Sequence, residues 1–218
     1  MPRAGRSCPT LPGVEVATIA GPARVDVAGQ ASPRLLLALT HGAAGLPDTP
    51  DLVAVAQAGE DIGAAVALVT QAYRVAGARA PGAAARQDAA WLDVTRALRR
   101  RCPGIPFVQG GRSNGARLAC RTAREAGAAG VIALAFPLRP PGRAGRPGPS
   151  RAGELRAAGV PVLVINGDRD PFGVPDASDA DRLVVLAGED HALRRDPARV
   201  ADAVREWLAD LARRAGWP

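Results

Sequence analysis

Short apolar runs alternate with stretches of helical periodicity from residue 35 to residue 214, and this alternation constrains the fold more than any other feature. The run at residues 35–40, LLLALT, is apolar at nearly every position, as is typical of a strand buried on both faces. Helix start and stop signals follow each such run. Strands and helices that alternate in this way form a mostly parallel sheet with helices on both faces. The sequence therefore predicts an α/β fold.

The predicted elements follow one another in a regular order. A hairpin of residues 14–19 and 23–27, joined at Gly21-Pro22, precedes the alternation. Buried strands are expected at residues 35–40, 64–70, 105–108, 131–136, 160–165 and 183–186. Helices are expected at residues 51–58, 81–101, 114–126, 151–158 and 196–214.

The length of 218 residues suits one domain, and we expect residues 1–218 to form it. We expect residues 1–12 to be a loose tail. Residues 138–150 break the alternation, because they hold four prolines and three arginines. They are expected to form an irregular basic loop within the domain, since the alternation resumes after them.

The charged residues exclude some chemistries. All 28 basic residues are arginine, so Schiff-base chemistry and a phosphate-loop lysine are excluded. The net charge is +7, but all-arginine usage with many alanine, glycine and proline residues looks like a coding bias. Aromatic residues make up only 3% of the chain, so few side chains are available on which nucleic-acid bases could stack. We therefore expect no nucleic-acid partner.

The cysteines and apolar stretches bear on location. Cys8, Cys102 and Cys120 have neither metal-ligand spacing nor the pattern of a disulfide framework, so reduced thiols in a cytoplasmic protein are expected. The longest uncharged apolar stretches, residues 35–47 and 126–138, are shorter than the ~20 residues of a membrane span. No signal peptide, membrane contact, metal or organic cofactor is predicted. The sequence does not predict the oligomeric state.

The strongest chemical motif is Gly111-Arg112-Ser113-Asn114-Gly115, which lies between a predicted strand and a predicted helix. The pattern G-x-S-x-G in this context is a nucleophile elbow. Glycines two residues before and after the serine let the strand and the helix approach closely. The serine hydroxyl then projects above the sheet beside a helix N-terminus, which favours developing negative charge.

Two further residues complete a candidate triad in the order serine, acid, histidine. His191 follows the predicted strand at residues 183–186, and Asp170 follows the strand at residues 160–165. Asp168 is a second candidate for the acid. We favour Asp170, three residues after Gly167, and expect Asp168 to hydrogen-bond within its own turn. Ser113, Asp170 and His191 thus lie after three different strands, at the edge where parallel α/β sheets carry their sites.

The loop His41-Gly42-Ala43-Ala44-Gly45 follows the strand at residues 35–40. Such a loop supplies one N–H group of an oxyanion hole, and the residue after the nucleophile supplies the other. We assign these donors to the backbone amides of Ala43 and Asn114. The His41 side chain is expected to hold the loop by a hydrogen bond.

These stretches resemble the α/β-hydrolase superfamily, and in particular the small lidless, dienelactone-hydrolase-like group that includes the KANL/Tex-type hydrolase domain. The resemblance covers most of residues 34–193. Its matching stretches are LLLALTHGAAG, QAYRVAGARAP, GGRSNGARLACRTA, VIALAFPLRPPGR, VINGDRDPFG and AGEDHAL. It implies that Ser113 is the nucleophile, Asp170 the acid and His191 the base. Lids in this fold usually arise where residues 138–150 lie, and this segment is too short for a helical lid.

Two functions remain open. The first is a serine hydrolase that acts on small or soluble esters through an acyl-enzyme, with an open site and no cofactor. The second is a catalytically silent binding or scaffold subunit, because some relatives serve in chromatin complexes. Arg74 and Arg112 lie on loops at the same sheet edge. Each either binds a substrate carboxylate or makes structural ion pairs and hydrogen bonds to loop carbonyls.

Overall fold

The computed structural model describes residues 11–30, 32–140 and 148–217. Its strands are β1 (Leu11–Thr18), β2 (Gly21–Gly29), β3 (Leu35–Thr40), β4 (Ala64–Thr70), β5 (Phe107–Arg112), β6 (Gly130–Leu134), β7 (Val162–Gly167) and β8 (Arg182–Leu186). Its helices are α1 (Pro50–Asp61), α2 (Ala72–Val75), α3 (Ala84–Arg101), α4 (Asn114–Ala126), α5 (Ala152–Arg156) and α6 (Pro197–Ala215), with a 3₁₀ turn at Ala177–Asp179.

The strands form one eight-stranded sheet in the order β1-β2-β4-β3-β5-β6-β7-β8. The strands from β3 to β8 run parallel, whereas β2 is antiparallel to both β1 and β4. The predicted hairpin and the mostly parallel sheet are thus confirmed. The carboxyl ends of β3, β5, β7 and β8 meet at one edge of the sheet, and the loops that carry the candidate residues leave from there.

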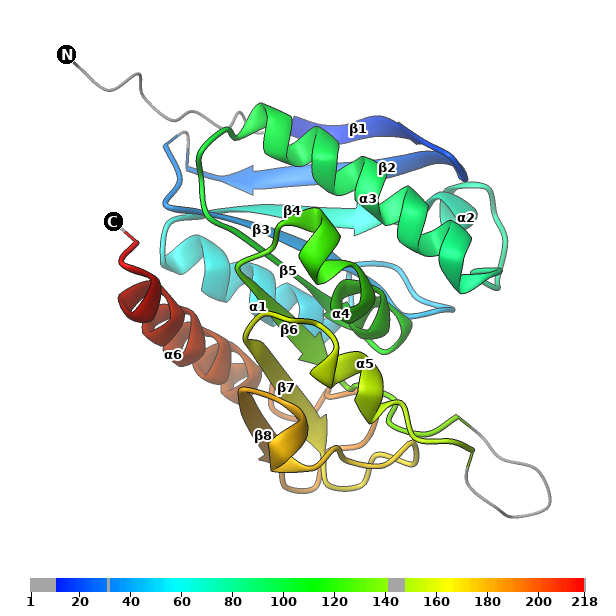
Figure 1. Ribbon diagram of the computed structural model, residues 1–218, viewed down its shortest axis with the longest axis vertical. Coiled ribbons are helices and arrows are strands. Elements are labelled where there is room, and N and C mark those ends of the chain that lie inside the picture. The colour runs from blue at the N-terminus through cyan, green and yellow to red at the C-terminus, as the bar shows by residue number, and fades with distance from the viewer. Residues whose placement is uncertain (1–10, 31, 141–147, 218) are drawn as a thin grey trace.

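Helices cover both faces of the sheet (Figure 1). On one face, α3 and α4 bury Trp91 and Leu118 against the sheet. On the other face, α1 packs against α6, which buries Trp207 at its centre. Most core positions are filled by Ala, Val and Leu, because the chain has few aromatic residues. Two separate apolar layers therefore fix the sheet in position beneath the loops of the site.

Several predicted elements differ from the structure in their bounds. Strand β5 was expected at residues 105–108, but it continues through Gly110 and Gly111 to Arg112. Glycine disfavours strands in general, but here a Cβ on Gly110 would lie 2.6 Å from the carbonyl oxygen of Ile132, so the neighbouring strand requires glycine. The short helix α2 was not predicted, because residues 72–75 are too few for a helical period.

The irregular segments are described in part. Residues 1–10 of the expected tail lie outside the described residues, and residues 11–12, which were expected to belong to the tail, are part of β1. Residues 141–147 of the expected basic loop also lie outside them. The described ends of that loop are tied to the protein by hydrogen bonds from Arg139 N to Phe172 O and from Arg151 N to Leu138 O.

The cysteines correct one expectation. Cys120 is a buried free thiol, and burial raises its pKa to about 12. Cys102, in contrast, is disulfide-bonded, so the prediction that all three thiols are reduced was wrong. Sequence spacing does not reveal which distant cysteines a fold brings together. Cys8 lies outside the described residues. No helix in the described part of the chain is long and apolar enough to cross a membrane.

Candidate active site

Ser113 lies at the sharp turn between β5 and α4. Its backbone has φ 52° and ψ −114°, a region that non-glycine residues rarely adopt. A hydrogen bond from Ser113 N to Leu134 O, 2.9 Å long, ties the turn to the neighbouring strand. The turn has the strand, strained residue and helix of a nucleophile elbow in the order that the motif predicts.

Two glycines make this turn possible. A Cβ on Gly111 would lie 2.6 Å from the carbonyl oxygen of Thr40, and a Cβ on Gly115 would lie 2.7 Å from the carbonyl oxygens of both Thr40 and His41. Side chains at either position would therefore separate β5 and α4 from the end of β3. The close approach places Ser113 beside the loop that follows β3, where a Cβ on Gly42 would lie 3.3 Å from Ser113 Cβ.

The structure brings Ser113, His191 and Asp170 together from three loops. His191 Nε2 lies 2.9 Å from Ser113 Oγ, and His191 Nδ1 lies 2.8 Å from Asp170 Oδ2. The Asp170 side chain is fully buried, and the histidine ring is partly exposed. The carboxylate fixes the proton on Nδ1, which leaves Nε2 free to accept the serine proton. This is the geometry of a hydroxyl activated by a general base.

Asp170 and Asp168 have different partners. Asp170 Oδ1 accepts a 2.9 Å hydrogen bond from Phe172 N, and its Oδ2 accepts a 3.3 Å bond from Asn166 Nδ2. Asp168 is exposed, and its Oδ1 accepts a 2.7 Å hydrogen bond from Gly188 N. Asp168 therefore holds together the two loops that carry Asp170 and His191, and it bonds to the neighbouring loop rather than to its own turn as expected.

His41 holds the candidate oxyanion loop through both ring nitrogens. Its Nε2 accepts a 3.0 Å hydrogen bond from Gln71 N, so the ring proton lies on Nδ1, which donates to Gly42 O at 2.8 Å. Burial lowers the pKa of His41, which keeps the ring neutral. Gln71 Nε2 also donates to His41 O at 3.2 Å. The expected loop-holding role of this side chain is thus confirmed.

The candidate oxyanion donors are the backbone N–H groups of Ala43 and Asn114. Within the described residues, the structure records no hydrogen bond donated by the backbone N–H of Ala43. Asn114 is the first residue of α4, where a backbone N–H has no acceptor in its own helix. Tyr73 supports the loop from the other side, because its hydroxyl donates a 2.8 Å hydrogen bond to Ala43 O. Burial raises the pKa of Tyr73 to about 12.

Arg74 makes contacts within the protein. Its Nε donates to Gly45 O at 3.2 Å, and its Nη1 donates to Ala78 O at 3.1 Å. The guanidinium therefore links the end of the candidate oxyanion loop to the segment after α2. These contacts match the structural interpretation of Arg74.

Arg112 likewise bonds to the protein itself. Its Nε donates to Asp51 Oδ2 at 2.9 Å, and its Nη2 donates to His191 O at 2.6 Å. The Asp51 carboxylate is fully buried, and its Oδ1 has no hydrogen-bond partner among the described residues. Arg112 thus joins the first turn of α1 to the backbone of the candidate base.

Sequence reasoning missed the residues that surround the triad. Asp51 and Tyr73 were not assigned to the site, although both lie on segments that leave the same sheet edge. Asn166 bridges Asp170 and the backbone of Phe136, and the Phe172 ring packs edge-on against His191 with centroids 4.5 Å apart. Asn166 lies at the end of a buried strand, where a polar residue needs a partner, and that was a usable signal.

The comparisons with known proteins agree with this fold. The family model of the alpha/beta hydrolase domain matches residues 33–211. The chain therefore belongs to the alpha/beta hydrolase family, which confirms the resemblance inferred from its motifs. No curated protein matches the sequence.

Solved structures share the fold across nearly the whole chain. Est1E from Butyrivibrio proteoclasticus superposes with a TM-score of 0.73 at 16% identity, covering 92% of this chain and 99% of that one. XC6422 from Xanthomonas campestris, a serine hydrolase without a lid, superposes with a TM-score of 0.72 at 19% identity, covering 96% of this chain and 98% of that one. A dienelactone hydrolase from Anabaena variabilis superposes with a TM-score of 0.72 at 16% identity, covering 94% of this chain and 98% of that one. At these identities the likeness concerns the fold.

Proposed function

We propose that the protein is a serine hydrolase that cleaves small or soluble esters through an acyl-enzyme intermediate. One observation carries the proposal: His191 bridges Ser113 and Asp170 with hydrogen-bond distances of 2.9 and 2.8 Å. The alpha/beta hydrolase family, together with a serine hydrolase and a thermophilic esterase among the structural neighbours, supports hydrolysis as the reaction class.

The geometry supports a two-step reaction. In the first step, Ser113 Oγ attacks the ester carbonyl while His191 Nε2 accepts the hydroxyl proton. The imidazolium, stabilised by Asp170, returns that proton to the departing alcohol. In the second step, His191 takes a proton from water, and the resulting hydroxide attacks the acyl-enzyme. The acid is released and the proton returns to Ser113.

The negative oxygen formed in each step needs hydrogen-bond donors. We assign the backbone N–H groups of Ala43 and Asn114 to this role. Removal of one such donor typically costs about 3–4 kcal/mol of transition-state stabilisation. The loop held by His41 and Tyr73 supplies the Ala43 donor, and the first turn of α4 supplies the Asn114 donor, so neither needs to rearrange during the reaction.

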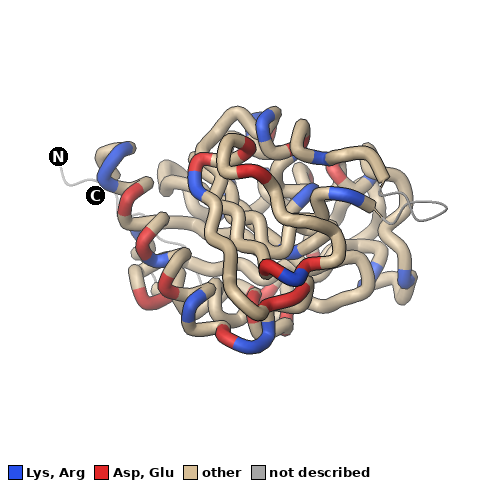
Figure 2. Tube along the Cα trace, turned by 90° about the horizontal axis from the view of Figure 1, so that it is seen from below, with Lys and Arg blue, Asp and Glu red and all other residues tan. Residues whose placement is uncertain are grey.

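A small-molecule substrate fits the charge distribution better than a nucleic acid does. Along α6, Arg213 pairs with Asp210 at 3.1 Å, and Arg214 pairs with Asp181 at 2.9 Å. Blue and red segments alternate along this helix and elsewhere in Figure 2. Arginines neutralised in this way make a weak phosphate-binding surface. We propose that the protein has no nucleic-acid partner.

The test of the proposal is covalent labelling combined with turnover. We expect a fluorophosphonate probe to label Ser113 and the protein to hydrolyse short p-nitrophenyl esters. The Ser113→Ala variant should lose both properties and keep its fold. An intact protein that neither reacts with the probe nor hydrolyses any ester would support the alternative of a silent binding subunit, especially if it copurifies with a stable partner.

A cytoplasmic location is a separate part of the proposal. It was expected from reduced thiols, and the disulfide at Cys102 is the observation that stands against it, because disulfides are rare in the cytosol. Cell fractionation with thiols blocked at lysis tests the proposal directly. Recovery outside the cytosol would overturn it.

A further inference from the structure

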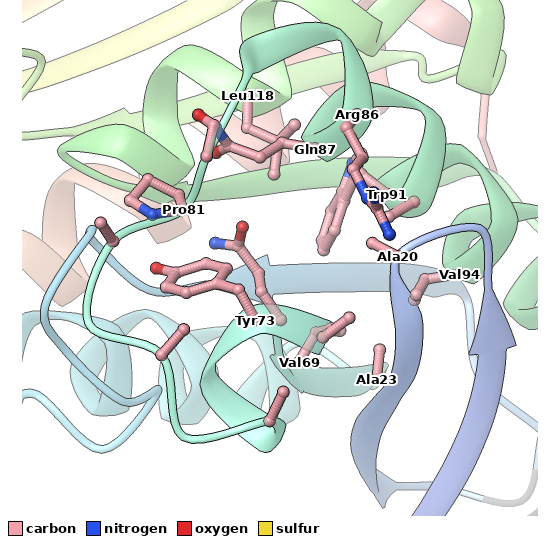
Figure 3. Close-up of a pocket in the computed structure, with 17 residues that line it drawn as sticks. Ala20, Ala23, Val69, Tyr73, Pro81, Arg86, Gln87, Trp91, Val94 and Leu118 are labelled. Carbon is pink, nitrogen blue, oxygen red and sulfur yellow. The ribbon is translucent and has the colours of Figure 1, made fainter.

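An apolar cavity of about 300 Å³ lies between α2, α3 and the turn that joins β1 and β2. Val69 of β4, Trp91 and Val94 of α3 and Leu118 of α4 form much of its wall. Figure 3 shows Tyr73 and Pro81 at one end of the cavity, and Ala20 and Val94 toward the other. The mechanism proposed above assigns no role to this space.

One end of the cavity adjoins the candidate oxyanion hole. Gln87 lines the cavity, and its Oε1 accepts a 2.8 Å hydrogen bond from the side chain of Asn114. Tyr73 also lines it and donates to Ala43 O at 2.8 Å. The two residues whose N–H groups are assigned to the oxyanion hole are thus each in direct contact with the cavity wall. The side chains of Gln87 and Tyr73 therefore link the cavity wall to both residues of the candidate oxyanion hole.

The glutamine and tryptophan side chains of the wall are already engaged within the protein, whereas Arg86, which also lines the cavity, makes one long hydrogen bond of 3.4 Å to Ile19 O. Gln87 Nε2 donates to Gly82 O at 3.0 Å, and Gln71 Nε2 donates to His41 O at 3.2 Å. Trp91 turns its indole N–H to Gln109 Oε1 at 2.9 Å, which leaves its ring to face the cavity. Away from Arg86, a ligand meets aromatic and aliphatic surface and few free donors, and this favours an uncharged, apolar group.

We propose that this cavity binds the acyl group of the substrate and that the group is an uncharged chain of medium length. The inference rests on the proposed function, because it extends the site of Ser113. The volume equals about ten times the ~30 Å³ that one water occupies in the liquid. Since a ligand fills most of such a pocket, it suits an acyl group of roughly six to ten carbon atoms.

A series of p-nitrophenyl esters from acetate to palmitate tests the proposal. We expect kcat/KM to be greatest near octanoate and about tenfold or more above acetate, because each buried methylene in an apolar pocket adds discrimination. Ala90 lines the cavity from α3, whereas Ala85 is exposed on the same helix and does not. Ala90→Leu should lower the ratio of octanoate to acetate activity about tenfold. Ala85→Leu should leave this ratio unchanged.

An enlarged cavity gives the opposite signature. Val94→Ala should move the preferred ester toward longer chains, and this variant keeps the inference testable if Ala90→Leu does not fold. Highest activity on acetate with a steady decline toward longer esters would overturn the inference, as would an unchanged ratio in folded Ala90→Leu.

A ligand-binding measurement distinguishes failure of this inference from failure of the proposed function. We expect the Ser113→Ala protein to bind octanamide, measured by calorimetry, about tenfold more tightly than its Ala90→Leu derivative does. Suppose that octanamide binding depends on Ala90 but that the protein neither reacts with the probe nor hydrolyses esters. This result would support the cavity as a binding site for apolar groups and overturn the proposed hydrolase activity. Probe labelling and ester turnover without Ala90-dependent binding or chain-length preference would support the hydrolase activity and overturn the role of the cavity.

Discussion

Arg112 donates a 2.6 Å hydrogen bond to the carbonyl oxygen of His191, the residue that contacts Ser113. The same guanidinium pairs with the buried carboxylate of Asp51. The residue next to the candidate nucleophile thus holds the backbone of the candidate base, and α1 anchors that contact. We infer that Arg112 is a positioning residue for His191.

Replacement of Arg112 by methionine should affect both stability and rate. The substitution leaves Asp51 as a buried carboxylate without its partner, so we expect a loss of about 3–5 kcal/mol in the free energy of unfolding. We also expect kcat to fall about ten- to a hundredfold, because the loop that carries His191 loses its anchor. Denaturant titration and ester kinetics measure the two effects.

The double variant Asp51→Asn/Arg112→Met separates the two effects. It should recover most of the lost stability, because no unpaired charge remains, but not the lost rate. Full recovery of kcat in the double variant would show that Arg112 acts through stability alone.

The two neighbouring aspartates should differ sharply in their effect on catalysis. Asp170→Asn should lower kcat by about 10⁴, because the amide no longer holds the histidine tautomer that can accept the serine proton. Asp168→Asn should cost far less activity, since Asp168 contacts Gly188 N rather than His191. Steady-state kinetics on both folded variants decide the matter. A greater loss from Asp168→Asn would show that the acid is assigned incorrectly.

The glycine after the elbow should tolerate no side chain. A Cβ on Gly115 would lie 2.7 Å from two backbone oxygens, so Gly115→Ala should lower the free energy of unfolding by about 1–3 kcal/mol and displace Ser113. Gly153 in α5 is the matched control, because a Cβ there meets nothing within 4 Å. Gly153→Ala should raise stability by about 0.5–1 kcal/mol. Thermal unfolding of both variants provides the test, and equal effects would contradict it.

Stability should fall in mild acid because of His41. Burial lowers its pKa below the ordinary value of 6.5, so below about pH 6.5 the unfolded chain binds a proton that the folded protein does not. The free energy of unfolding should therefore decrease as the pH falls, by up to about 1.4 kcal/mol per pH unit. Denaturant titrations between pH 7.5 and 5.5 measure the slope.

The second histidine supplies the control for this slope. His41→Gln should flatten the dependence, whereas His191→Gln should retain it, and these are the two histidines of the chain. A slope that disappears with His191 and persists without His41 would contradict the assignment.

The sequence predicted several of the strands and helices that carry the site closely. Strands β3 and β4 and helix α4 have the predicted bounds, because a continuous apolar run or a helix closed by Gly127 is a strong local signal. Strand β5 and helix α2 were predicted less well. Two glycines end the apolar run of β5. Glycine is required there because β3 and β6, which are distant in sequence, lie too close for a side chain.

The sequence by itself determined the order of the elements and the position of the elbow, because hydrophobic periodicity and glycine placement act over a few residues. Only the tertiary structure decided the partners of Arg74 and Arg112, which each could have bound a substrate carboxylate. It also revealed Asp51 and Tyr73 beside the site and the cavity behind the oxyanion loop. Arg112 and His191 are 79 residues apart, and no local pattern records a contact that depends on how separate loops meet at one sheet edge.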